Sequence, residues 1–289
     1  MQSRYLKLRH LVIVLCLSVF AFSTRSIASQ KDGLLKIRFF DIGQGDAIFI
    51  ETPNGSQVLI DGGPDNKILQ KLGEVIPFYD KDIDLVVVSH PHADHLVGLI
   101  DVLNRYEVKN IIEAKENYVS SDFNAWREAV NNESSVEIEA ISGKEIDLGS
   151  EVTLAILHPF DSVAGTSTKT PHDDVVVAIL KYKSFELMLT GDIEAKVERR
   201  LILEGYDLDS DVLKVGHHGS KTSTTEEFLS EVSPEVAVIQ VGADNRYGHP
   251  TEEVLKRLDS FGIKHYRNDL NGDIAVISDG LNFQISKSN

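Results

Sequence analysis

The chain has 289 residues, and its 45 Asp and Glu outnumber its 29 Lys and Arg, which gives a formal net charge of −16 at pH 7. Broad electrostatic capture of nucleic acid needs Lys and Arg to neutralise phosphates, so this composition excludes it. The single cysteine, Cys16, excludes a disulfide framework and thiolate chemistry in the rest of the chain, where any metal must be held by nitrogen and oxygen.

The first segment, residues 1–28, has the pattern of a secretory signal peptide. A positively charged start precedes the apolar run 11–22, and Ser26 and Ala28 are the small residues that a signal peptidase reads. The run is too short to span a bilayer, which takes about 20 residues in a helix, although an uncleaved membrane anchor is the alternative. Cleavage after Ala28 would remove four Lys and Arg and change the net charge from −16 to −20. We therefore expect an exported protein, periplasmic or secreted, with residues 29–289 forming one domain and no stable membrane span.

Short β-branched runs alternate with helical patterns along the rest of the chain. In chain order the sequence predicts strands 34–42, 46–52 and 56–63, helix 67–77, strand 83–90, helix 93–105, strand 108–113, helix 122–131, strands 136–141, 151–158, 175–182 and 185–190, helix 193–204, strand 211–216, helix 223–231, strand 235–241, helix 251–261, and strands 263–267 and 273–279. This order favours an α/β fold with four layers, an αβ/βα sandwich in which two mixed sheets face each other and helices flank them. The loop 159–174 lacks periodicity, and we expect it to border the functional site.

The words "HPHADH" place four metal-ligating side chains within six positions, at the end of strand 83–90. His90 and His92 can point the same way in an extended turn, and Asp94 and His95 can face back towards them from the next helix. Imidazole suits zinc and similar metals, and carboxylate adds a harder oxygen, so two adjacent metal sites can be built here. The alternative is a helix N-terminus with exposed histidines.

Two further sequence motifs follow predicted strands, at the positions where α/β folds place functional residues. Asp192 in "LTGD" can lie exposed at a sheet edge, or it can cap helix 193–204. His217 and His218 are consecutive, so we expect at most one of them to be a ligand.

Polar loop residues add to these candidates. Ser220 and Lys221 open a hydroxyl-rich turn that can hold a phosphate through backbone N–H groups and the lysine, or that serves as an ordinary helix cap. His172 precedes strand 175–182, and His249 precedes helix 251–261. A lone loop histidine is usually solvated, and only the shared position at element junctions makes these two candidates.

Together these sequence motifs resemble those of the metallo-β-lactamase superfamily, and most closely those of the exported hydrolase domain of the ComEC-type DNA-uptake proteins and its stand-alone relatives. The resemblance is carried in order by "FFDIGQGDAIFIETPNGSQVLIDGG" (39–63), "VVVSHPHADHLVGL" (86–99), "LMLTGDIE" (187–194), "DVLKVGHHGSKTS" (211–223), "NRYGHPTEEVLKRL" (245–258) and "RNDLNGDIAV" (267–276). It implies the metallo-β-lactamase fold, a hydrolase domain over residues 29–289, and a site for two metal ions, zinc with manganese or iron as alternatives.

The resemblance also implies roles for individual residues. His90 and His92 would bind the first metal, Asp94 and His95 the second, and Asp192 would bridge both. His217, favoured over His218, would complete the second site. Two further roles concern the surroundings of these ligands: Asp61 would orient ligand histidines, and His172 would be the third ligand of the first metal. His172 is a departure, because ComEC-type domains often carry Asn there.

The implied chemistry is hydrolysis by a hydroxide that bridges two zinc ions, which is nucleophilic at neutral pH because zinc lowers the pKa of bound water to about 7. Asp94 would orient the hydroxide, and His218 or His249 would protonate the leaving oxygen or bind the phosphate, with ordinary packing as the alternative for both. We expect a phosphodiesterase or nuclease-like enzyme. The DNA-uptake resemblance favours a nuclease, whereas the acidic charge favours a small-molecule or nucleotide phosphoester over long nucleic acid. Lactonase or β-lactamase chemistry and a non-catalytic metal-binding role are the alternatives.

Overall fold

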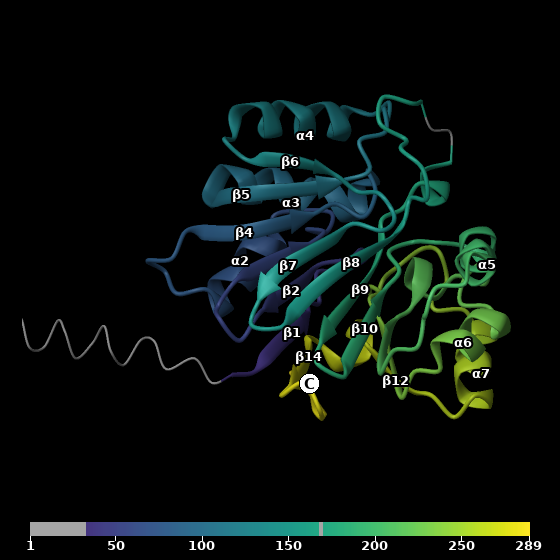
Figure 1. The fold of residues 1–289 in the computed structure, drawn as a ribbon. Coiled ribbons are helices and arrows are strands. Elements are labelled where there is room, and N and C mark those ends of the chain that lie inside the picture. The colour runs from purple at the N-terminus through teal and green to yellow at the C-terminus, as the bar shows by residue number, and fades with distance from the viewer. Residues whose placement is uncertain (1–32, 168–169) are drawn as a thin grey trace, which may run out of the picture. The chain divides into compact units, whose positions relative to one another are not determined.

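Two mixed β-sheets lie face to face, with helices on the outer side of each (Figure 1). The computed structural model describes residues 33–167 and 170–289. The expected signal peptide 1–28 lies outside these described residues, and Leu34–Asn289 form one compact unit. Among the described residues, no helix combines the length and apolarity that a membrane span requires.

The first sheet has the strand order β15–β14–β1–β2–β3–β4–β5–β6. Its strands are β1 (Leu35–Phe39), β2 (Ile48–Glu51), β3 (Gln57–Ile60), β4 (Asp82–Val87), β5 (Glu107–Glu113), β6 (Val136–Glu139), β14 (Ile274–Ser278) and β15 (Phe283–Lys287). The pairs from β15 to β3 are antiparallel, and those from β3 to β6 are parallel.

The second sheet repeats this plan with the order β13–β12–β11–β10–β9–β8–β7. Its strands are β7 (Glu145–Gly149), β8 (Val152–His158), β9 (Val177–Tyr182), β10 (Phe185–Leu189), β11 (Val212–Lys214), β12 (Val236–Ile239) and β13 (Lys264–Arg267). The pairs from β7 to β10 are antiparallel, and those from β10 to β13 are parallel. Parallel strands end at the same edge of a sheet, so each sheet has one edge suited to a site.

Helices cover the outer face of each sheet (Figure 1). The elements are α2 (Lys67–Val75), α3 (Ala93–Arg105), α4 (Ser121–Asn132), α5 (Ala195–Glu204), α6 (Glu226–Val232), α7 (Glu252–Ser260) and α8 (Asn268–Asn271), with 3₁₀ helices η1 (Pro171–Asp173) and η2 (Gly216–Gly219). Buried residues of α2, α3 and α4 pack on the first sheet, and those of α5, α6 and α7 pack on the second. A third apolar core fills the space between the sheets. These layers confirm the predicted αβ/βα sandwich.

Burial along the strands explains why the sequence pattern predicted them. Strands β1 and β14 alternate between buried and half-buried residues because one face meets the core between the sheets. Strand β12 is buried at every position, as expected for a parallel strand covered on both faces. The six predicted helices and thirteen predicted strands all have counterparts, whereas β7, β15, α8 and the 3₁₀ helices were not predicted.

Helix α3 lies unusually close to the turn after β3. The N–H of Gly98 donates to the carbonyl of Gly63 at 2.9 Å, and the N–H of Gly62 donates to the carbonyl of His95 at 2.7 Å. A Cβ at Gly98 would lie 2.0 Å from the carbonyl oxygen of Gly62, so only glycine allows this approach. The contact brings Asp61 and His95 together at the edge of the first sheet.

Candidate metal centre

The predicted ligands come together where the parallel strands of both sheets end. His90 follows β4, and Asp94 and His95 lie in the first turn of α3. Asp192 follows β10, and η2 carries two histidines directly after β11. His90 and His95 are buried, so the alternative of exposed histidines at a helix N-terminus is wrong. The residue that precedes α5 is Glu194, so the alternative of Asp192 as the cap of that helix is also wrong.

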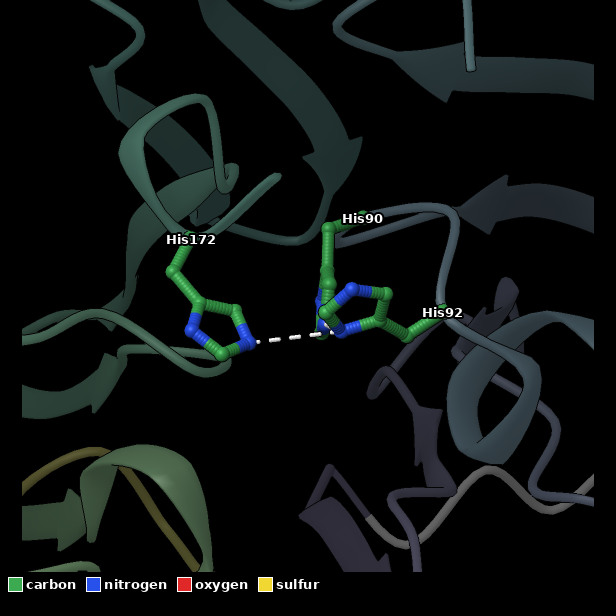
Figure 2. Close-up of side chains that lie close together, drawn as sticks. All are labelled: His90, His92 and His172. Carbon is green, nitrogen blue, oxygen red and sulfur yellow. Dashed lines mark hydrogen bonds between the residues drawn. The ribbon is translucent and has the colours of Figure 1, made fainter. Parts of the chain in front are cut away.

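One cluster consists of His90, His92 and His172 (Figure 2). Nε2 of His90 lies 2.9 Å from Nδ1 of His92, and Nε2 of His172 lies 3.3 Å from that same nitrogen. His172 comes from η1, far along the chain and outside the first sheet, and its side chain points towards the other two. Three imidazoles with converging nitrogen atoms form a donor set of the kind that binds zinc.

A second cluster consists of Asp94, His95 and His218. Nε2 of His218 lies 3.3 Å from Oδ2 of Asp94. His95 and His218 are almost fully buried, and Nδ1 of His218 bonds to the carbonyl of Gln240 at 2.9 Å, which fixes the orientation of the ring.

Asp192 lies between the two clusters. Its Oδ2 is 3.4 Å from Nε2 of His95 and 3.4 Å from Nε2 of His218. The same oxygen is 3.9 Å from Nε2 of His90 in the first cluster. One buried carboxylate therefore faces ligand-type nitrogens of both clusters, which is the position of a bridging ligand.

The two consecutive histidines of η2 point to different neighbours. Both have left-handed backbone conformations, with φ of 46° at His217 and 53° at His218. His218 joins the second cluster, whereas His217 groups with His172 and Asp192 and places its Nδ1 3.3 Å from Oε1 of Glu194. The sequence favoured His217 as the ligand that completes the second site. The structure instead places His218 there, because the turn directs His218 into that cluster.

Asp61 lies behind the ligands, as its predicted role requires. Its Oδ2 is 2.8 Å from Nδ1 of His95 and accepts the hydroxyl hydrogen of Ser89 at 2.6 Å. The backbone N–H of Ser89 donates to the other oxygen at 2.8 Å. Because Nδ1 of His95 faces this carboxylate, Nε2 is left facing Asp192.

The sequence reasoning missed Asp46 and Lys214. Both are almost fully buried, and Nζ of Lys214 lies 2.5 Å from Oδ2 of Asp46 and 3.7 Å from Oδ1 of Asp192. It also donates to the carbonyl of Gly191 at 2.9 Å. A lysine inside the apolar strand "DVLKVG" was the available signal, because a charge in a buried strand requires a partner.

Burial and neighbouring charge shift the pKa values of these groups in different directions. Burial, with the adjacent His172, lowers the pKa of His92 to about 4, so this imidazole is neutral near pH 7. The pKa values of His95 and of His218 lie above the ordinary value. Burial alone would lower them, but Asp192 and the other nearby carboxylates outweigh burial. The carboxylates thus make the centre attractive to positive charge.

The donor atoms fit bound metal ions. Within the described part of the chain, Nε2 of His95 and Nε2 of His218, which both face Oδ2 of Asp192, are buried without a hydrogen-bond partner. Buried polar atoms are normally paired, so these atoms are those that an ion would engage. Imidazole and carboxylate, without any thiolate, match zinc and also admit harder metals such as manganese or iron.

The candidate substrate residues divide into two groups. His249 lines a cavity of about 200 Å³ together with Asp192 and five residues of the two clusters and η2, and its ring lies 5.7 Å from that of His217. Ser220 and Lys221 are not among the residues that line this cavity, and the Ser220 hydroxyl bonds to that of Thr222. Of the residues predicted to contact the substrate, His218 and His249 line this cavity, whereas Ser220 and Lys221 do not.

The comparisons with known proteins agree with this geometry. Residues 40–242 match the model of the metallo-β-lactamase superfamily. ComE operon protein 3 of Bacillus subtilis is 30% identical over 83% of this chain and 32% of its own length. Recombination protein 2 of Haemophilus influenzae is 28% identical over 92% of this chain and 31% of its own length. The chain thus spans about a third of these relatives.

A solved structure shows the same fold. The metallo-β-lactamase fold protein YhfI of Bacillus subtilis superposes with a TM-score of 0.52 at 11% identity, over 80% of this chain and 95% of that protein. The family model covers the first histidine cluster, Asp192 and both histidines of η2, so the match and the site coincide. The chain belongs to the metallo-β-lactamase superfamily.

Proposed function

We propose that this protein is a metal-dependent hydrolase that cleaves phosphoesters, with phosphodiesters as its main substrates. The coarser part, a metal-dependent hydrolase, follows from superfamily membership. The observation that carries the proposal is Asp192, whose carboxylate faces unpartnered imidazole nitrogens of His95 and His218 and also His90.

The proposed metals are two zinc ions. His90, His92 and His172 would hold one, Asp94, His95 and His218 the other, and Asp192 would contact both. When bound, the ions supply an activated water near neutral pH and a Lewis acid for the phosphoryl oxygen.

The residues around the ions would prepare the reaction. Asp61 holds His95 in the orientation that directs Nε2 into the centre. Asp94, at the wall of the cavity, would accept a hydrogen bond from the attacking water and orient it. His249 lines the same cavity, and its buried Nδ1 has no partner among the described residues, so it is our candidate to protonate the leaving oxygen.

Two observations bear on the class of substrate. The relatives are named for a ComE operon and for recombination, which supports a nucleic acid or nucleotide substrate. The net charge of −16 opposes binding of long nucleic acid. We therefore propose a short phosphodiester, such as a dinucleotide or a nucleotide ester, over a long polymer.

We also propose that the protein is exported. The support is the charged start, apolar run and small residues of segment 1–28. Expression in a bacterial host followed by N-terminal sequencing of the exported protein tests this: a new N-terminus at Ser29 is expected, and an intact N-terminus retained with the cells would contradict it.

A substrate panel tests the reaction. Zinc-loaded protein is assayed with bis(p-nitrophenyl) phosphate, p-nitrophenyl phosphate, a lactone and a cephalosporin, beside an Asp192→Asn variant. We expect turnover of the diester, slower turnover of the monoester and loss of both in the variant. Turnover of the lactone or cephalosporin alone would replace phosphoester hydrolysis by carbonyl chemistry, and zinc binding without any turnover would favour an accessory role.

A further inference from the structure

Gln44 stands at the boundary between two cavities. The cavity at the metal centre, of about 200 Å³, and a second cavity of about 460 Å³ share Gln44, Asp94 and Tyr247 in their walls. The second cavity is lined mainly by the loops 42–44 and 244–247, and no histidine is among its lining residues. A substrate that reaches the metal ions and is larger than the first cavity would pass Gln44.

The side chain of Gln44 presents an unpaired donor at this boundary. Its Oε1 accepts the backbone N–H of Gly242 at 3.2 Å, and because a backbone N–H can only donate, the amide oxygen must be the atom that faces Gly242. The amide nitrogen Nε2 is the other polar atom of this side chain, which lines both cavities, and it is buried without a hydrogen-bond partner among the described residues. Leaving a buried donor unsatisfied is unfavourable, and this cost is recovered if a ligand supplies an acceptor.

Close backbone contacts hold Gln44 in this position. A Cβ at Gly45 would lie 2.1 Å from the carbonyl oxygen of Asp94, and a Cβ at Gly242 would lie 2.6 Å from the backbone nitrogen of Gln44. The N–H of Asp46 also donates to the carbonyl of Asp94 at 3.2 Å. The loop that carries Gln44 is thus fixed against the first turn of α3, the same turn that carries a proposed metal ligand.

The second cavity has the chemistry of a site for an uncharged ring. Tyr247 is 58% exposed, and its ring stacks on that of His249 with centroids 5.9 Å apart and an interplanar angle of 16°. The carboxylates of Asp65, Asp94 and Asp244 also line the cavity, and the cation among its lining residues, Arg246, has its Cζ 5.7 Å from the centroid of the Tyr247 ring. A second phosphate would be repelled by these carboxylates, whereas an uncharged ring could contact the exposed part of Tyr247.

We propose that Gln44 is a substrate-binding residue whose Nε2 donates a hydrogen bond to a non-bridging oxygen of the phosphoester, and that the second cavity accepts one ring-bearing substituent of a diester. This inference rests on the proposed function and extends it, because it selects diesters that carry a ring on one side over monoesters and over small alkyl diesters.

The first test removes the donor from Gln44. Gln44→Met keeps the side-chain size and loses the amide, and Gln44→Glu keeps an acceptor for the N–H of Gly242 but replaces the donor by a negative charge. We expect kcat/KM for bis(p-nitrophenyl) phosphate to fall about 100-fold in both variants, as when a single preorganised donor is removed. Zinc content should stay at the wild-type value, and the affinity for inorganic phosphate, measured by calorimetry on zinc-loaded protein, should fall as well.

Gln70→Met is the matched control: Gln70 lies on the exposed face of α2, so the same substitution is made there far from the cavity.

The second test is Tyr247→Ala, assayed with bis(p-nitrophenyl) phosphate and with methyl p-nitrophenyl phosphate. We expect a loss of about 10-fold with the first substrate and little change with the second, because only the first has a second ring to stack.

The outcomes separate this inference from the function on which it rests. If wild-type protein hydrolyses no phosphoester, the proposed function fails. If wild-type protein hydrolyses the diester and the Gln44 variants keep its rate and phosphate affinity, only the role of Gln44 is overturned. An equal effect of Tyr247→Ala on both diesters would overturn the role of the second cavity.

Discussion

His217 and His218 are adjacent in sequence, yet they have different surroundings. The left-handed backbone at both residues turns His218 into the cluster with Asp94 and His95 and leaves His217 beside Glu194. We expect His218→Ala to lose more zinc than His217→Ala, because His218 belongs to the group with Asp94 and His95, whereas His217 adds to a group with His172 and Asp192. Elemental analysis after dialysis measures the content. A loss of zinc in His217→Ala with no loss in His218→Ala would instead support His217 as the ligand of the second site.

Glu116 is a buried carboxyl outside the metal centre. It is 4% exposed, and its Oε1 has no partner among the described residues. Burial, together with the charges of Asp174 and Glu113, raises the pKa of Glu116 to about 7. Because the folded-state pKa lies above the unfolded value, the protonated form favours folding at low pH, and this stability is lost as pH rises through about 7.

The substitution Glu116→Gln tests this, because glutamine resembles the protonated acid at every pH. We expect the variant to match wild type near pH 5 and to be more stable by about 2 kcal/mol near pH 8.5, measured by urea unfolding of metal-free protein. Glu128→Gln, on the exposed side of α4, serves as the control and should change little at either pH. An equal effect of Glu116→Gln at both pH values would contradict the shifted pKa.

At the residue scale, local spacing predicted the metal-ligating cluster in "HPHADH", whereas Asp61, His172 and Asp192 received their roles through the family resemblance. The four ligand-type residues of "HPHADH" follow one strand, so their convergence depends only on a turn and the start of a helix. Asp46, Gln44 and Lys214 escaped prediction because their neighbours in the fold are distant in sequence. The choice between His217 and His218 depends on backbone angles that residue types do not specify.

At the scale of elements, the contact between α3 and the turn after β3 positions the second cluster. We expect Gly98→Ala to destabilise the fold by about 1–3 kcal/mol, because its Cβ would collide with the carbonyl of Gly62. Gly73→Ala in α2 is the matched control, since open space surrounds it, and it should stabilise the helix by up to about 1 kcal/mol. Urea unfolding measures both, and equal shifts would argue against a tight α3 contact.

The elements that the sequence failed to predict share weak apolar signals. Strand β7 and strand β15 are mostly exposed or half-buried and lie at the sheet edges, so neither shows a clear alternation of apolar residues. The 3₁₀ helix η1 arises in a loop where the sequence has no periodicity, and its position is set by contacts of His172. Strongly buried elements such as α3 and β12 were predicted because burial imposes a pattern on their sequences.

At the scale of the whole molecule, the site requires both sheets. The first sheet and α3 supply His90, Asp94 and His95, while the second sheet supplies Asp192 and His218. Strand pairing and the packing of one sheet on the other are long-range choices that periodicity does not encode, so the sequence predicted the layers only through their order and through family resemblance. The centre is therefore assembled only when both halves fold.

The central claim, a hydrolase that depends on two metal ions held by these ligands, is tested most directly by one titration. Metal-free protein is titrated with Zn²⁺ while hydrolysis of bis(p-nitrophenyl) phosphate is recorded at each addition. We predict almost no hydrolysis at the start and a rate that rises and levels off near about two ions per chain. Full activity of the metal-free protein, or saturation with zinc without any hydrolysis, would contradict the account.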